Sequence, residues 1–190
     1  MITDEEYEEF VKTLIKPSAQ LDAEVTEDEK MLLLVATTLI NNSIKSCKNP
    51  TCDRPGYLNL LHMMSGLGSE SGELVDAIKK IVIYRKYPGS INEPNSIAWN
   101  VREEIGDLCW FQTGNKIIRQ EENQEIFQDD FWGNLKYFLD LWNKMYPNNE
   151  ITIDSAKRFN MEKLGERYKG LKYTNEAAQN RADKGKATGE

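Results

Sequence analysis

The sequence predicts an all-α protein. Apolar residues recur at three- and four-residue steps along most of the chain, which is the spacing that lines one face of a helix. Runs in which apolar and polar residues alternate, as they do in a half-buried strand, are scarce. Proline, glycine and asparagine cluster between the periodic stretches, where they end one helix before the next begins. The expected architecture is therefore a bundle of packed helices.

The periodic stretches give the expected helices, with boundaries good to about three residues. They cover residues 4–15, 27–46, 57–84, 96–120, 130–146 and 154–168, and a short last helix is expected after Thr174. Residues 121–130 are polar and acidic and are expected to form a loop or a frayed helix end. No break is long enough for an interdomain linker, so residues 1–182 are expected to form one domain and residues 183–190 a disordered tail.

Charge and composition exclude several classes of protein. The chain has 31 acidic against 24 basic residues and a net charge of -7, which argues against a surface that wraps nucleic acid. A small anionic ligand stays possible if cations or a local Lys/Arg group mediate its binding. No stretch approaches the ~18 apolar residues of a membrane span, the N-terminus MITDEEYEEF has no signal pattern, and three cysteines do not suggest a disulfide scaffold. We expect a cytoplasmic protein without a membrane partner.

Two pairs of acidic residues are the most informative feature. Glu70 and Glu73 are three residues apart in GLGSESGELVDAIKK (residues 66–80), and Glu104 and Asp107 have the same spacing in VREEIGDLCWF (residues 101–111). On a helix this spacing places both side chains of a pair on one face. Each pair alone would normally be a solvated face. Because each lies beside the apolar stripe of its helix, the two pairs face each other if the helices fold back antiparallel.

Carboxylates brought together in this way repel one another. At ~5 Å and an effective dielectric of ~20, each unscreened pair costs roughly 3 kcal/mol. A divalent cation relieves the repulsion, and an all-oxygen ligand set favours magnesium, manganese or calcium over zinc. The small residues around Glu70, among them Gly66, Gly68 and Gly72, permit close helix contact or leave room for a ligand; a helix break is the alternative.

The residues around both pairs resemble a known family. LLHMMSGLGSESGELVDAIKKIVIY (residues 60–84) followed by REEIGDLCWF (residues 102–111) is similar to the all-α NTP pyrophosphatase superfamily, which includes MazG and the dimeric dUTPases. The pattern most resembles the MazG-like nucleotide pyrophosphohydrolases often carried by phages. The similarity is good over residues 58–118 and weaker over residues 159–181. It implies a four-helix-bundle-like catalytic core, here residues 57–120 and 154–182, with N-terminal helices and an inserted aromatic helix (131–145) added.

The resemblance also implies the site. By this resemblance Glu70, Glu73, Glu104 and Asp107 are the metal ligands, for Mg²⁺ with Mn²⁺ as the alternative, and Glu70 or Glu73 takes a proton from the attacking water. The family's closing segment supplies phosphate-binding side chains. The positions of this chain that match that segment are Asn160, Lys163 and Arg167.

Other residues admit two interpretations. Lys79 or Lys80 could reach a phosphate from the first helix, and Lys163 and Arg167 could instead be cations that favour a helix C-terminus. His62 is a candidate for the base pocket, although a lone histidine among Leu and Met is more often part of the core. Asp76 and Glu103 are expected to be solvated or to support the ligands from behind. The aromatic stripe on helix 130–146 is expected to be core or an oligomer interface.

The implied activity is the hydrolysis of a nucleoside triphosphate between its α and β phosphates. The same chemistry on phosphoribosyl-ATP or another nucleotide pyrophosphate is an alternative, and a non-catalytic helical interaction protein is another. The resemblance further implies a homodimer or homotetramer, in the host cytoplasm if a phage encodes the chain. Base and sugar specificity, the number of metal ions and the role of residues 1–50 do not follow from the sequence.

Overall fold

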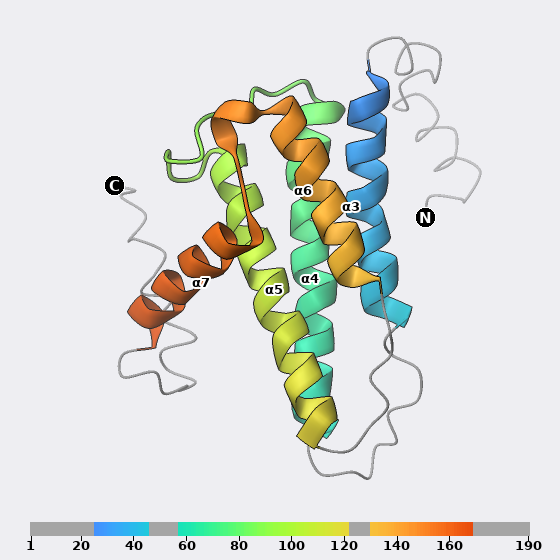
Figure 1. Cartoon of the computed structure of the whole chain (residues 1–190), viewed down its shortest axis with the longest axis vertical. Helices are drawn as coiled ribbons and strands as arrows, with labels where there is room; N and C mark the ends of the chain where they lie inside the picture. The colour runs from blue at the N-terminus through green and yellow to red at the C-terminus, as the bar shows by residue number, and fades with distance from the viewer. Residues whose placement is uncertain (1–24, 46–56, 122–129, 169–190) are drawn as a thin grey trace, which may run out of the picture.

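The computed structural model describes residues 25–45, 57–121 and 130–168, and within these ranges it is all-helical (Figure 1). The helices agree with the expected ones to within about two residues at each end. The expected helix 4–15, the last helix after Thr174 and the tail lie outside the described residues. The described elements are α3 (Glu27–Lys45), α4 (Tyr57–Val82), α5 (Ile97–Glu121), α6 (Phe131–Met145), a 3-10 turn (Pro147–Asn149) and α7 (Ile153–Arg167).

Hydroxyl side chains fix where three of these helices begin. Thr26 and Glu29 form a reciprocal capping box before α3, in which the Thr26 backbone N–H donates to Glu29 Oε2 at 2.7 Å. The Ser96 hydroxyl accepts from the Trp99 backbone N–H at 3.0 Å and so caps α5. Thr152 and Ser155 cap α7 in the same way. Each contact satisfies backbone N–H groups that have no partner inside the helix, so these local signals set the helix boundaries.

The central pair of the bundle is α4 and α5, which lie antiparallel and side by side (Figure 1). Helix α3 packs on the other side of α4, α6 packs on α3, and α7 crosses α5 at the edge of the bundle. One hydrophobic core draws side chains from all five helices. Its fully buried aliphatic members include Leu32, Leu39, Leu67, Leu74, Ile78, Ile105, Leu108 and Leu135.

The aromatic helix α6 contributes to this core. Phe131, Leu135, Phe138 and Trp142 are buried, and the Trp142 indole N–H donates to the Asn149 backbone carbonyl at 2.8 Å. The stripe expected to be core or interface is therefore core along these four positions.

A buried asparagine closes the connection between α4 and α5. The Asn149 side chain accepts from the Ile91 backbone N–H and donates to the Gly89 carbonyl, both at 2.9 Å. Gly89 has a φ of +73°, which glycine adopts without strain. Together these contacts hold the segment that turns the chain from α4 back into α5.

Two glycines allow the site helices to approach closely. A Cβ atom on Gly66 would lie 2.1 Å from the Phe111 ring, and one on Gly106 would lie 2.7 Å from the backbone oxygen of Ala156. Gly66 therefore brings α4 against α5, and Gly106 brings α5 against α7. Since α4 runs unbroken from Tyr57 to Val82, the small-residue cluster does not mark a helix break.

Replacing Gly106 with alanine is expected to lower the free energy of unfolding by about 2 kcal/mol, because the new methyl group collides with backbone that a side-chain rotation cannot move. Gly68→Ala is the matched control. Apart from its chain neighbours and the nearby backbone of α4, no described atom lies within 4 Å of a Cβ at Gly68, so alanine there should raise stability by up to about 1 kcal/mol. Urea denaturation of both variants measures the difference. Equal effects of the two substitutions would show that α7 does not pack tightly on α5.

Candidate metal centre

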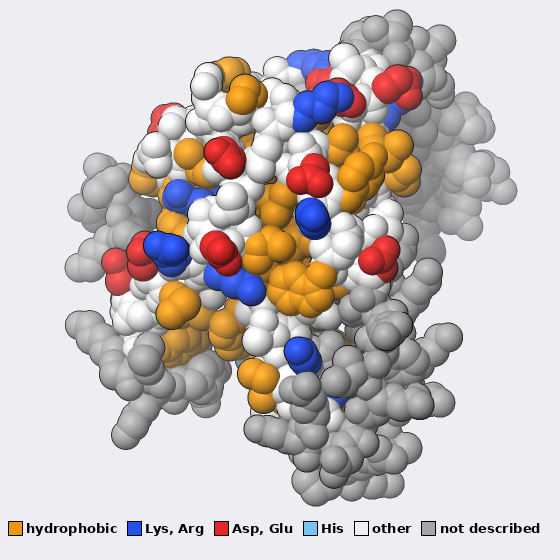
Figure 2. Space-filling view, viewed as in Figure 1, with side chains coloured by type: hydrophobic (Ala, Val, Ile, Leu, Met, Phe, Trp, Pro, Cys, Tyr) orange, Lys and Arg blue, Asp and Glu red, His pale blue; other side chains and the backbone are white. Residues whose placement is uncertain are grey.

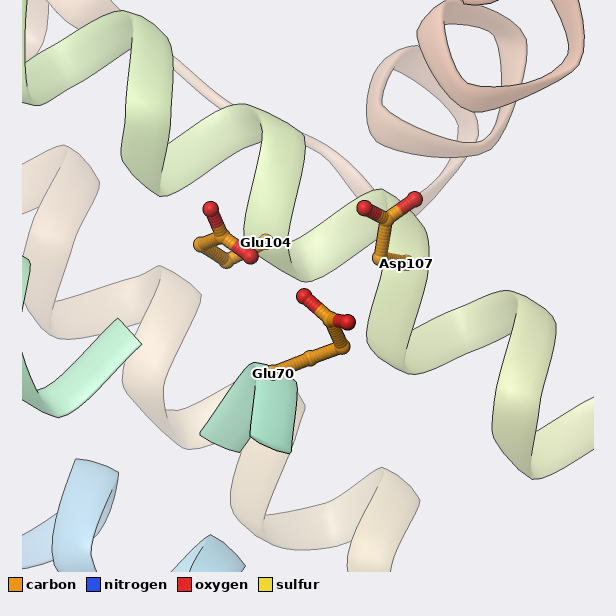
Figure 3. Close-up of side chains that lie close together, drawn as sticks. All are labelled: Glu70, Glu104 and Asp107. Atoms are coloured by element: carbon orange, nitrogen blue, oxygen red, sulfur yellow. The ribbon is translucent and has the colours of Figure 1, made fainter. Parts of the chain in front are cut away.

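Three carboxyl groups from two helices meet between α4 and α5. Figure 3 shows Glu70 on α4 pointing toward Glu104 and Asp107 on α5. One carboxylate oxygen from each of the three lies within 4.8 Å of the others. The antiparallel pairing of α4 and α5 produces this convergence, and it was expected from the spacing of the acidic pairs.

The centre of this cluster is buried. Glu104 is only 7% exposed, and its Oε2 atom has no hydrogen-bond partner. A buried carboxyl oxygen without a partner costs free energy, because nothing replaces the water it has lost. Glu70 lies opposite and is half-buried.

Burial and mutual repulsion keep a proton in the cluster. Burial, a hydrogen bond with Glu70 and the charges of Glu70, Glu73 and Glu103 raise the pKa of Glu104 to about 10. The pKa of Glu70 is also raised, chiefly by burial and then by the charges of Asp107 and Glu73, against the lowering effect of the Glu104 hydrogen bond and of Lys163. At neutral pH Glu104 therefore holds a proton and shares it with Glu70.

Helix α7 closes the other side of the cluster. The Lys163 Nζ atom lies 2.6 Å from Asp107 Oδ1 and 3.3 Å from Glu103 Oε1. The Asn160 side-chain amide also donates to Asp107 Oδ1. Lys163 is 7% exposed and Asn160 4%, so α7 presents a buried cation and a buried amide to the acidic cluster.

The expected ligand Glu73 lies outside the group of three. Its side chain is exposed, yet its charge raises the pKa of both Glu70 and Glu104. Residues three apart on a helix are separated by about 60° around the axis. Because Glu70 faces α5, Glu73 lies at the rim of the cluster.

The expected phosphate-binding residues are not all together. Lys163 and Asn160 contact Asp107. Lys80 instead forms an ion pair at 2.8 Å with Asp76, which lies one turn before it on α4. The Arg167 guanidinium lies 6.0 Å from the centre of the Tyr168 ring. For Lys163, the interpretation as a simple helix-end cation is wrong, since its ammonium is buried on two carboxylates.

The expectation that His62 belongs to the core is wrong. Its side chain is exposed and lies edge-on to two rings, with centroid distances of 6.4 Å to Trp110 and 6.0 Å to Phe111. The neighbouring Met63 and Met64 are buried instead, because they lie on the face of α4 that packs into the bundle.

We expected Glu103 either to be solvated or to support the ligands from behind. Solvation is wrong, because Glu103 is buried and only 6% exposed. Adjacent residues on a helix point about 100° apart. When Glu104 faces α4, Glu103 must therefore point elsewhere, here toward Lys163 on α7. Its spacing of four from Asp107 places both carboxylates within reach of one cation, and this was the available sequence signal.

The residues present fit a hard divalent cation. All three clustered donors are carboxylate oxygens, the donor type that magnesium and manganese prefer. The partnerless Glu104 Oε2 supplies an acceptor that the fold itself does not satisfy. The glutamate and aspartate carboxyls could thus hold such an ion after loss of the shared proton.

One face of the molecule carries mixed charge. On the described part of the face drawn in Figure 2, acidic and basic side chains are interspersed with apolar ones, without a broad basic area. Among the described helices, none combines the length and the apolar composition that a membrane crossing needs.

Comparison of the chain with protein-family models, with curated proteins and with solved structures finds no match.

The raised pKa of Glu104 predicts how stability changes with pH. The folded, metal-free protein keeps this proton up to about pH 10, whereas a glutamate loses it near its ordinary value of 4.5 in the unfolded chain. The folded state then binds more protons than the unfolded state, so stability falls as pH rises, by about 1 kcal/mol per pH unit. Urea denaturation in EDTA between about pH 6 and pH 9 tests this. In Glu104→Gln the slope should be smaller, and equal slopes would contradict a proton on Glu104.

Proposed function

We propose that this protein is a magnesium-dependent nucleotide pyrophosphohydrolase that converts a (deoxy)nucleoside triphosphate to the monophosphate and pyrophosphate. The supporting observation is the convergence of Glu70, Glu104 and Asp107 on one point, with Glu104 buried and one of its oxygens without a partner. A protein that folds such a cluster accepts a large electrostatic cost. A bound divalent cation turns the same cluster into a favourable site.

The proposal includes the resemblance to the MazG-like family. In that family acidic residues of two neighbouring helices hold the metal, and here α4 and α5 supply Glu70, Glu104 and Asp107 to one cluster. In this proposal Glu73, at the rim, completes the ligand set when the ion binds. The added α3 packs on α4 and α6 packs on α3, so these helices support the catalytic helix.

The side chains divide the chemical work between them. When bound, magnesium supplies charge neutralisation and a water of lowered pKa. Glu70 faces α5 and Glu73 lies at the rim of the cluster, and either could accept a proton from that water. Lys163 and Arg167, on the last turns of α7, supply positive charge for the oxygens of the leaving pyrophosphate. The water oxygen forms a bond to the α-phosphorus while the bond between that phosphorus and the bridging oxygen breaks, which leaves a nucleoside monophosphate and releases pyrophosphate.

In this proposal the base of the nucleotide binds near the N-terminal half of α4, ahead of Glu70. His62 precedes Glu70 by two helical turns, and Trp110 follows Asp107 by one turn on the antiparallel α5. Both side chains are exposed and their rings contact each other edge-on. An exposed aromatic pair at this place suits the planar base of a nucleotide.

Replacement of the acidic ligands should abolish hydrolysis. In Glu70→Gln and Glu104→Gln we expect kcat/KM to fall by about a hundredfold or more, or ~3 kcal/mol of transition-state stabilisation. Both variants should stay folded, because each removes repulsion from the cluster. Asp76→Asn is the matched control on the same helix, since the Asp76 carboxylate pairs with Lys80 outside the cluster, and its activity should stay within about threefold of wild type.

The assay should follow both possible products over a panel of substrates. Release of pyrophosphate from nucleoside triphosphates, dependent on Mg²⁺ or Mn²⁺, supports the proposal, and phosphoribosyl-ATP and dinucleotide pyrophosphates in the panel identify the substrate class. Orthophosphate as the sole product would remove the assignment of cleavage between the α and β phosphates. A chain that hydrolyses none of these and is indifferent to magnesium would be a helical binding protein instead.

A further inference from the structure

Lys163 already occupies the acidic cluster with a positive charge. Its ammonium lies 2.6 Å from one Asp107 oxygen and 2.5 Å from the other, so it binds both oxygens of that carboxylate. The Asp107 side chain is 19% exposed and that of Lys163 is 6% exposed. In such a buried contact the ammonium is largely shielded from water and its attraction to the carboxylate is strong.

This contact conflicts with metal coordination by Asp107. An ammonium and a divalent ion seek the same lone pairs, and two cations repel when both lie within contact distance of one carboxylate. Asn160 also donates to Asp107 Oδ1. With both partners in place, Asp107 has little capacity left for an ion, although it lies within the group of carboxylates that faces one point.

Glu103 offers the ammonium a second position. Its carboxylate is buried, and its Oε1 lies 3.3 Å from Lys163 Nζ, farther than either Asp107 oxygen. Because Glu103 points toward α7 and is not one of the three converging carboxyls, it can retain the lysine without competing for the ion. The lysine therefore needs to move only a short way to leave Asp107.

We infer that Lys163 is an internal substitute for the divalent ion, which neutralises Asp107 in the metal-free protein and transfers to Glu103 when the ion binds. The inference rests on the metal site of the proposed function and adds its regulation: the ion must displace a lysine, and only then is that lysine available to the phosphates of a substrate. Glu103 is a positioning residue in this scheme, since it acts on the ion through Lys163, whereas Lys163 itself goes on to contact the phosphates of the substrate.

The first test measures binding of the metal alone by isothermal titration with Mg²⁺ and Mn²⁺. Lys163→Met removes the competitor, so the dissociation constant should fall by about tenfold. Glu103→Gln removes the carboxylate that would hold the displaced lysine, so the dissociation constant should rise by a similar factor. Lys157→Met is the control, because it deletes the same charge from α7 at a lysine that lies over the Trp132 ring, and it should change the constant by less than about twofold.

The second test uses the wild-type chain and does not depend on whether a variant folds. A buried, ion-paired ammonium exchanges its protons slowly, so the Lys163 Nζ should give a ¹H–¹⁵N signal in the metal-free protein, assigned by through-bond correlations that connect it to the backbone of Lys163. Addition of Mg²⁺ should shift this signal strongly or remove it. A signal that is unchanged at saturating Mg²⁺ overturns the inference, because the lysine would then not have left Asp107.

The outcomes separate the inference from the proposed function. Equal metal affinity in wild type, Lys163→Met and Lys157→Met overturns the displacement and leaves the metal site intact. If the dissociation constant for the ion falls equally in Lys163→Met and Lys157→Met, the displacement is also overturned, because the loss of any positive charge from α7 would then explain the tighter binding. Absence of Mg²⁺ and Mn²⁺ binding in wild type and in Lys163→Met overturns both the inference and the proposed function.

Discussion

The structure around the candidate site depends on the repulsion between carboxyl groups that α4 and α5 bring together. Glu104 is buried opposite Glu70, and Asp107 lies one turn further along α5. At separations of about 5 Å these groups cannot all be ionised without a large cost. In the metal-free protein a proton relieves the repulsion at one end of the cluster, between Glu104 and Glu70, and the ammonium of Lys163 relieves it at the other end, on Asp107.

The bundle keeps these groups together by close packing of the backbone. Phe111 of α5 occupies the space that a side chain at Gly66 would fill, one turn before Glu70, and Ala156 of α7 approaches Gly106 beside Asp107. Both contacts lie within a turn of a cluster carboxyl. Small displacements of either helix would separate the carboxyls, so the glycines help to set the separation that makes the charges interact.

The features that followed from the sequence were those encoded locally. The prolines between helices mark boundaries within a few residues, and the apolar stripes of α4 and α5 determine which side of each helix is buried. The convergence of Glu70, Glu104 and Asp107 followed because antiparallel pairing of adjacent helices is the simplest outcome of a short connection. These expectations depended only on the helical repeat and on the pairing of helices that follow each other in the chain.

The remaining features depend on how helices rotate and cross, which periodicity does not determine. Whether Glu70 or Glu73 faces α5 is a question of about 60° around α4. The rotation of α4 about its axis also determines that His62 is exposed. The pairing of Glu103 with Lys163 joins residues 60 positions apart and exists only because α7 crosses α5 at that turn. The charge pattern showed that these residues were present, and only the tertiary arrangement shows which of them meet.

One contact therefore has two consequences. The bond between Lys163 and Asp107 satisfies buried charges on α5 and α7, so it stabilises the docking of α7, and it also engages a candidate ligand. Removing either partner alone leaves a buried charge unmatched, which is destabilising. An ion that takes over Asp107 compensates for the lost contact only if Glu103 continues to neutralise the lysine. Glu103, next to Glu104, would therefore let the site exchange the Lys163 ammonium for a divalent ion without releasing α7.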